Sequence, residues 1–177
     1  MKKKQKFLAL FVEILKKYKK IHKAGYLHGD VQPDHIFMIS GKPVIIDWGL
    51  GVRVDDKSFN YRGGLVHFVA PEIAEQMTKK ATSIPYDQTS EVYAIAAVFF
   101  LLFTGKTPIS YGNDNFMSVP FNQKLKFIVS GNFISFEQAS SPPFPELEKI
   151  LQICLSPDKK MRYSSYKFLD ELLRIQA

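Results

Sequence analysis

The chain opens on a stretch in which apolar side chains recur every three or four positions. The positions that carry this period are Phe7, Leu10, Phe11, Ile14, Tyr18 and Ile21. Such spacing places apolar residues on one face of an α-helix, so the lysines between them fall on the opposite face. We therefore expect an amphipathic helix, and Gly25 ends its periodicity.

A second pattern is the apolar run Val92 to Phe103 in the middle of the chain. Roughly 20 apolar residues are needed to cross a bilayer, so this run is too short to do so. A helix that is apolar on every side is typical of the buried centre of a helical domain. We expect that role here, and no transmembrane segment.

Between these two patterns lie two short apolar runs, Ile36 to Ile39 and Pro43 to Ile46, separated by Ser40-Gly41-Lys42. Two such runs around a glycine-containing turn predict a β-hairpin. Tyr26 to Val31, just before, is expected to form a short strand or loop. Residues 50–69 have no sustained period and contain two adjacent glycines, which predicts a long loop.

The remainder of the chain has a helical pattern. We expect helices at Pro71 to Lys79, Thr89 to Thr104, Asn122 to Val129, Glu146 to Cys154 and Ser164 to Ile175. The fold class predicted from these patterns is mainly α with a small β-hairpin.

The amino-acid composition restricts the kind of protein further. A chain of 177 residues with 46% hydrophobic and 23% charged residues has the composition of an ordinary globular domain. Cys154 is the only cysteine, which excludes an intrachain disulfide and paired-thiolate metal sites; a reducing, cytoplasmic setting is the simplest interpretation. The net charge of +7 comes largely from the first helix. We interpret its lysines as a solvated face, with an anionic partner or membrane surface as the alternative. No nucleic-acid partner is expected.

Five short motifs, taken together, resemble those of a known protein family. They are His28-Gly29-Asp30, Asp47-Trp48-Gly49, Ala70-Pro71-Glu72, Ser90-Glu91-Val92-Tyr93, and Pro157-Asp158 through Arg162. In this order, with a hairpin between the first two, they resemble the C-terminal lobe of a eukaryotic-type protein kinase. The resemblance implies one domain over residues 1–177 without the family's N-terminal β lobe. Its parts would be a catalytic loop (27–37), a metal-binding segment (47–49), an activation segment (50–72) and a helical subdomain (73–177).

The resemblance also implies chemical roles for two carboxylates. Asp30 matches the aspartate that accepts the hydrogen of the attacking hydroxyl, and Asp47 matches the one that holds the metal bridging the ATP phosphates. The implied cofactors are ATP and Mg²⁺ or Mn²⁺. Because the hairpin begins after the first carboxylate and ends before the second, the two can lie near each other. The alternative is that each is a loop carboxylate that accepts hydrogen bonds from backbone N–H groups.

Other matched positions are architectural. Glu72 matches the glutamate that pairs with the arginine numbered Arg162 here, which ties the activation segment to the last helices. His28 and Trp48 resemble the stacked lower half of the family's regulatory spine, and Gly49 completes the metal-binding tripeptide. Glu91 replaces the aspartate that usually anchors this spine, and its side chain is one methylene longer.

Phe37 falls where the family has the apolar floor under the adenine ring. An ordinary core residue of the hairpin is an equally good interpretation of this position.

The catalytic loop departs from the family pattern at Gly29, which replaces an arginine that normally meets a phosphorylated activation segment. The resemblance therefore implies that this chain does not need such phosphorylation. Ser58 and Tyr61 lie in the segment, and we interpret both as generic surface hydroxyls.

Two further departures change the chemistry of the loop. Gln32 replaces a lysine, and its amide can still bind a phosphate but brings no positive charge. His35 stands where the family has a metal-binding asparagine. Imidazole is a poor ligand for Mg²⁺, whereas Mn²⁺ tolerates it better. The alternative for His35 is a histidine that is hydrogen-bonded to neighbouring backbone.

Three functions remain open. The first is a Ser/Thr protein kinase lobe that becomes active only when a partner or a longer chain supplies the N-terminal lobe, since these residues leave no room for one. The second is an inactive pseudokinase that binds proteins as a scaffold. The third is a small-molecule kinase, because His-Gly-Asp also resembles aminoglycoside and sugar kinases; the segment around Glu72 favours the protein kinase branch.

Overall fold

The fold is built around one buried helix, α3 (Gln88–Thr104). The computed structural model describes residues 2–56, 61, 63–112 and 118–176. Every residue from Ser90 to Phe100 is buried. The helix begins at an N-cap, Asp87, whose carboxylate accepts hydrogen bonds from the N–H groups of Thr89 and Ser90. It ends where Gly105 adopts a left-handed conformation with φ 78°. The expected central helix is confirmed.

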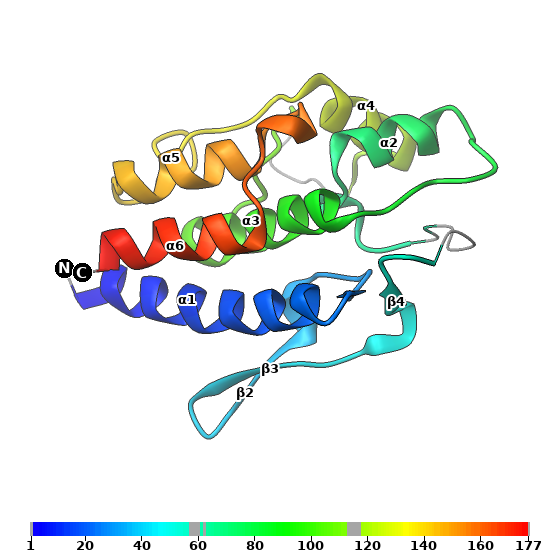
Figure 1. Ribbon diagram of the computed structural model, residues 1–177. Coiled ribbons are helices and arrows are strands. Elements are labelled where there is room, and N and C mark those ends of the chain that lie inside the picture. The colour runs from blue at the N-terminus through cyan, green and yellow to red at the C-terminus, as the bar shows by residue number, and fades with distance from the viewer. Residues whose placement is uncertain (1, 57–60, 62, 113–117, 177) are drawn as a thin grey trace.

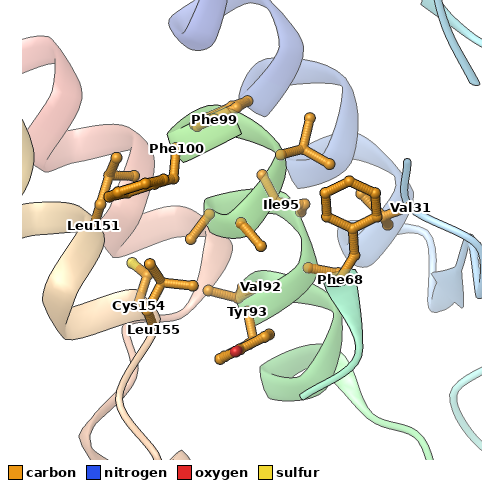
Figure 2. Close-up of a cluster of buried hydrophobic side chains, with 14 of the residues drawn as sticks. Val31, Phe68, Val92, Tyr93, Ile95, Phe99, Phe100, Leu151, Cys154 and Leu155 are labelled. Carbon is orange, nitrogen blue, oxygen red and sulfur yellow. The ribbon is translucent and has the colours of Figure 1, made fainter. Parts of the chain in front are cut away.

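The other helices surround α3. Helices α1 (Lys2–Lys23) and α6 (Ser165–Gln176) lie side by side, with the start of α1 near the end of α6, and α5 (Pro145–Cys154) lies beyond α6 (Figure 1). Helices α2 (Pro71–Thr78) and α4 (Phe121–Ser130) pack together at the other end of the domain. Figure 2 shows the core that results: Leu151 and Cys154 of α5 approach α3 from one side, and Val31 and Phe68 from the other.

The strands form two small antiparallel sheets. Strand β2 (Ile36–Ile39) pairs with β3 (Lys42–Ile45) in the expected hairpin, with Ile36 opposite Ile45. Its turn is Ser40-Gly41, and both residues have positive φ, as tight hairpin turns require. Strand β1 (Tyr26–Leu27) pairs with β4 (Val52–Arg53), a pairing that the sequence pattern did not predict. Short 3₁₀ helices in the described part of the chain span Pro33–His35, Trp48–Leu50, Val66–Phe68 and Lys159–Met161.

The predicted fold class, mainly α with a small hairpin, is confirmed, and each predicted helix is present within one residue at either end. No helix among the described residues is long and apolar enough to span a membrane. The interpretation of Tyr61 as a surface hydroxyl is wrong, because the residue is buried and its ring stacks on Tyr86 with centroids 4.7 Å apart. Ser58 lies outside the described residues.

Candidate active site

The loop that carries Asp30 is held from below by Glu91 of α3. This carboxylate is fully buried and accepts hydrogen bonds from the backbone N–H groups of His28 (2.8 Å) and Gly29 (2.9 Å). Charge-assisted hydrogen bonds of this kind are among the stronger ones in proteins. Glu91 therefore fixes the backbone of the loop directly before Asp30.

A buried histidine that the sequence gave no reason to single out supports Glu91. His22, in the last turn of α1, contacts Glu91 Oε1 through Nε2 at 2.9 Å and Ser165 Oγ through Nδ1 at 2.9 Å. Ser165 is the first residue of α6. Residues from three helices thus meet beneath the loop. This cluster could not be recognised from the sequence, because its members are far apart along the chain.

Gly29 has a conformational reason to be glycine. Its φ is +79°, in the left-handed region that disfavours residues with a Cβ. A Cβ at this position would overlap the carbonyl oxygen of Leu50 and lie 3.1 Å from its carbonyl carbon. The segment after Asp47 therefore packs directly on the loop backbone. This packing leaves no room for the side chain of the arginine that the family has at this position.

Asp30 and Asp47 lie on opposite sides of one imidazole. His35 Nδ1 is 3.6 Å from Asp30 Oδ2, and His35 Nε2 is 3.4 Å from Asp47 Oδ2. Gln32 Nε2 donates to Asp30 Oδ2 at 3.1 Å and lies 2.9 Å from His35 Nε2. The loop and the end of the hairpin thus bring together four of the residues that the resemblance assigned to the site.

The other oxygen of Asp30, Oδ1, differs from Oδ2 in having no partner within the part of the chain that the structure describes. Among the described residues, buried Oδ1 has no hydrogen-bond partner. A buried acceptor without a donor is costly, so a hydroxyl that donates to it would be favoured.

The same residues form only part of a metal site. Within the described ranges, no group of three His, Cys, Asp or Glu side chains is arranged to hold an ion. The Asp47 side chain is 60% exposed on a residue with positive φ, so its oxygens are accessible. His35 Nδ1 contacts the carbonyl oxygen of Asp30 at 2.9 Å, which agrees with the backbone-satisfied alternative. Asp47 is thus the residue best placed to hold Mg²⁺ or Mn²⁺, and an oxygen ligand of this type suits both.

His28 and Trp48 touch, but their rings are not stacked. Their centroids are 4.9 Å apart at an interplanar angle of 67°, an edge-on contact. The assignment of the two residues to a regulatory spine stays a prediction. His28 Nε2 also contacts the carbonyl oxygen of Ile46 at 2.8 Å, which ties the loop to the end of the hairpin. The adjacent Gly49 donates its N–H to Asp47 Oδ1 at 3.4 Å.

Phe37 is 54% exposed, and Met38 and Ile39 beside it are also exposed. The alternative interpretation of Phe37 as a hairpin core residue is therefore wrong. The assignment of Phe37 to the floor of an adenine site stays a prediction.

The pairing of Glu72 with Arg162 is present as expected. Their two hydrogen bonds measure 2.8 and 2.6 Å, and the arginine side chain is fully buried. Ser90 also donates to Glu72 at 2.8 Å, and Arg162 donates to the carbonyl oxygen of Ser156. Because the arginine is buried and satisfied on several sides, this pair fixes how α2 meets the last helices.

A groove of about 960 Å³ begins beside the loop that carries Asp30. Its lining includes Pro33, Asp34, Leu65, Phe68 and, near the end of α3, Leu101. The lining also includes His67, and burial, followed by the charge of Lys124, lowers the pKa of His67 to about 4. The imidazole is therefore neutral near pH 7, and its Nδ1 contacts the Tyr111 hydroxyl at 3.0 Å.

The fold and the site together define a protein-kinase-like helical lobe. The sequence model of the Protein kinase domain family matches residues 2–173, so the chain belongs to the protein kinase family.

Three curated relatives illustrate the similarity. The probable serine/threonine-protein kinase gdt4 of Dictyostelium discoideum is 25% identical over 88% of this chain. Kinase suppressor of Ras 2 of Mus musculus is 30% identical over 79%, and serine/threonine-protein kinase PknD of Chlamydia felis is 24% identical over 93%. The chain matches only 9%, 17% and 18% of the lengths of these relatives, respectively.

Proposed function

We propose that these residues form the C-terminal lobe of a Ser/Thr protein kinase and contribute to transfer of the γ-phosphoryl group of ATP to a protein hydroxyl. In this proposal a second lobe, from a longer chain or a partner protein, covers the hairpin. Asp30 accepts the hydrogen of the attacking hydroxyl through Oδ1, while Glu91 holds the loop. When bound, Mg²⁺ or Mn²⁺ neutralises phosphate charge, and Asp47 is the residue that would hold it.

The observation that carries this proposal is the unpartnered, buried Oδ1 of Asp30. A loop carboxylate with a purely structural role would be expected to have both oxygens hydrogen-bonded. Here Oδ2 accepts from Gln32, while Oδ1 lies close to Gly64 of the activation segment. A hydroxyl group that donated a hydrogen bond to Oδ1 would satisfy this acceptor.

The test is a thermal-shift titration of the 177-residue chain with ATP and either Mg²⁺ or Mn²⁺. At an ATP concentration of about ten times Kd, linkage predicts a rise in Tm of about 3–6 °C. Asp47→Asn should remove this rise in Tm. The rise should be larger with Mn²⁺ than with Mg²⁺, because Mn²⁺ tolerates the imidazole of His35 better as a ligand. A variant that combines Gln32→Lys with His35→Asn serves as a repaired site. If neither the native chain nor the repaired variant responds, nucleotide binding by this lobe is refuted.

A second candidate function is that of a protein-binding scaffold without catalysis. It is favoured by His35 and Gln32, which occupy the space between the two carboxylates with hydrogen bonds of their own. This reading predicts that Asp30→Asn leaves the function of the protein in its cell unchanged. A loss of function on that substitution would argue for catalysis.

The third candidate is a small-molecule kinase. The groove beside Asp34 mixes apolar side chains such as Leu65 and Phe68 with polar ones such as Lys106 and Gln138, so its lining does not favour a peptide over a sugar. The protein kinase branch is favoured instead by the Ala70-Pro71-Glu72 segment and the helices that follow it.

A further inference from the structure

A second pocket, of about 290 Å³, adjoins the groove beside Asp34. We call it the α5 pocket, because Glu148, Leu151 and Gln152 of α5 line it. Protein interiors are close-packed and contain few voids larger than a water molecule, so a pocket of this size is not a packing defect. An apolar cavity of about 150 Å³ can hold benzene. The α5 pocket therefore has room for a ligand with about two rings.

The lining of the α5 pocket combines buried apolar side chains with more exposed polar ones. Leu151 and Leu155 are buried, as is Phe100 of α3, which lies beside Leu151 in Figure 2. Glu148 and Gln152 lie on the same side of the helix, three residues before each leucine. Glu148 is half-buried and Gln152 is exposed. A ligand that matches this lining is apolar at one end and polar at the other.

The segment 133–138 supplies a further part of the lining, and hydrogen bonds hold its backbone in place. The N–H of Ile134 donates to the carbonyl oxygen of Pro108 at 2.9 Å, and the N–H of Phe136 donates to Glu148 Oε1 at 2.7 Å. Phe133 also forms a β-bridge with Ile109. Because these contacts are internal to the fold, little conformational freedom is lost when a ligand binds.

The charge of Glu148 determines which polar group the pocket accepts. Its Oε1 accepts the hydrogen bond from Phe136, but no Lys, Arg or His among the described residues forms an ion pair with this carboxylate. A half-buried carboxylate attracts a cation more strongly than an exposed one does, because water screens its charge less. The rings of Phe100 and Phe133, which also line the pocket, attract cations through their faces. The pocket therefore complements a cation and repels an anion.

We infer that the α5 pocket binds a small organic cation, in which an ammonium group is attached to an apolar body of about two rings. The apolar body packs against the buried side chains of the lining, and the ammonium group donates to Glu148. The site contains neither Asp30 nor Asp47, so binding does not depend on phosphoryl transfer. Because Ile134 and Gln138 also line the neighbouring groove, a bound cation contacts residues of that groove too.

The test is a titration of the 177-residue chain with tryptamine, which joins an indole ring to an ammonium group, followed by two-dimensional NMR. The matched probes are indole-3-propionate, an anion with the same ring, and 3-methylindole, which is neutral. We expect tryptamine to bind with a Kd of about 1 mM or below. Indole-3-propionate should bind at least about tenfold more weakly, because its charge is repelled by Glu148. Equal affinity for the three probes would overturn the proposal, as would the absence of any spectral change with tryptamine at about ten times that Kd.

Glu148→Gln tests whether tryptamine binds in the α5 pocket. This substitution removes the charge but keeps an oxygen that can accept the hydrogen bond from Phe136, so the segment 133–138 should stay in place. Tryptamine should bind at least about tenfold more weakly, whereas the Kd of 3-methylindole should change less than about threefold. An unchanged Kd for tryptamine would overturn the proposal.

The matched control is Glu146→Gln. Glu146 is exposed on the same helix and does not line the pocket, and the change in net charge is the same. Its Kd for tryptamine should stay within about twofold of the native value, because water and salt screen an exposed charge. An equal loss of affinity in both variants would show that net charge alone attracts the cation, which would refute the site. If Glu148→Gln lowers the Tm of the chain, the comparison of the three probes on the native chain still decides the question.

Discussion

Gly29→Ala tests whether the catalytic loop and the segment after Asp47 are packed as closely as the structure shows. Two effects add at this position. A residue with a Cβ costs about 1–2 kcal/mol in the left-handed conformation. The overlap of that Cβ with the backbone of Leu50 adds about 1–3 kcal/mol, because backbone atoms cannot turn aside as a flexible side chain can. We expect a total loss of about 2–5 kcal/mol in the free energy of unfolding.

The chain offers a matched control in Gly25. It also has φ +79°, but nothing lies within 4 Å of a Cβ built there. Gly25→Ala should therefore show only the conformational part, and the difference between the two variants measures the contact with Leu50. Urea unfolding followed by circular dichroism gives both values. If the two variants are destabilised equally, the close approach of the loop to Leu50 is wrong.

Three other perturbations address the supports of the site. Glu91→Gln should lower the free energy of unfolding by about 2–4 kcal/mol, because two loop N–H groups lose a charged acceptor. Glu91→Asp keeps the charge and should cost less. Urea unfolding in which the Asp variant is less stable than the Gln variant would contradict this. A double-mutant cycle of Arg162→Met and Glu72→Gln should give a coupling of about 1–3 kcal/mol, and a coupling near zero would show that the pair is not formed. Burial alone would raise the pKa of Asp87, but hydrogen bonds from Thr89, Ser90 and Lys159 lower it to about 2. The contribution of the Asp87 carboxylate to stability should be complete above about pH 4 and lost as the pH falls through about 2. Asp87→Asn should flatten this part of an acid-unfolding profile. An unchanged profile would show that the hydrogen bonds to Asp87 do not stabilise the fold.

The helices were predictable because each has a local signal. The apolar period of α1 and the uniform apolar run of α3 each identify a helix without knowledge of its neighbours. The ends of α3 also have local causes in the structure, because the Asp87 side chain caps its start and Gly105 ends it in a left-handed conformation. The pairing of β1 with β4 had no such signal, because each strand is only two residues long and the partners are separated by the whole hairpin.

The candidate site was predictable as a set of residues but not as an arrangement. Motif order indicated that Asp30 and Asp47 lie near each other, yet nothing in the sequence placed His35 between them. Tyr61 was misjudged for a related reason. Its burial depends on stacking against Tyr86, a contact between two irregular segments that no periodicity encodes.

The departures of the loop from the family pattern are physically connected, which changes how they should be tested. Gln32 donates to Asp30 and contacts His35, and His35 in turn lies between the two carboxylates. His35→Asn alone would remove a partner of Gln32 and leave a gap beside Asp30, so it should weaken the loop rather than restore the family arrangement. Restoring the family residues at both positions replaces the connected pair together. For this reason the response of the double variant to ATP, and not that of either single one, distinguishes a modified active site from one that has lost its chemistry.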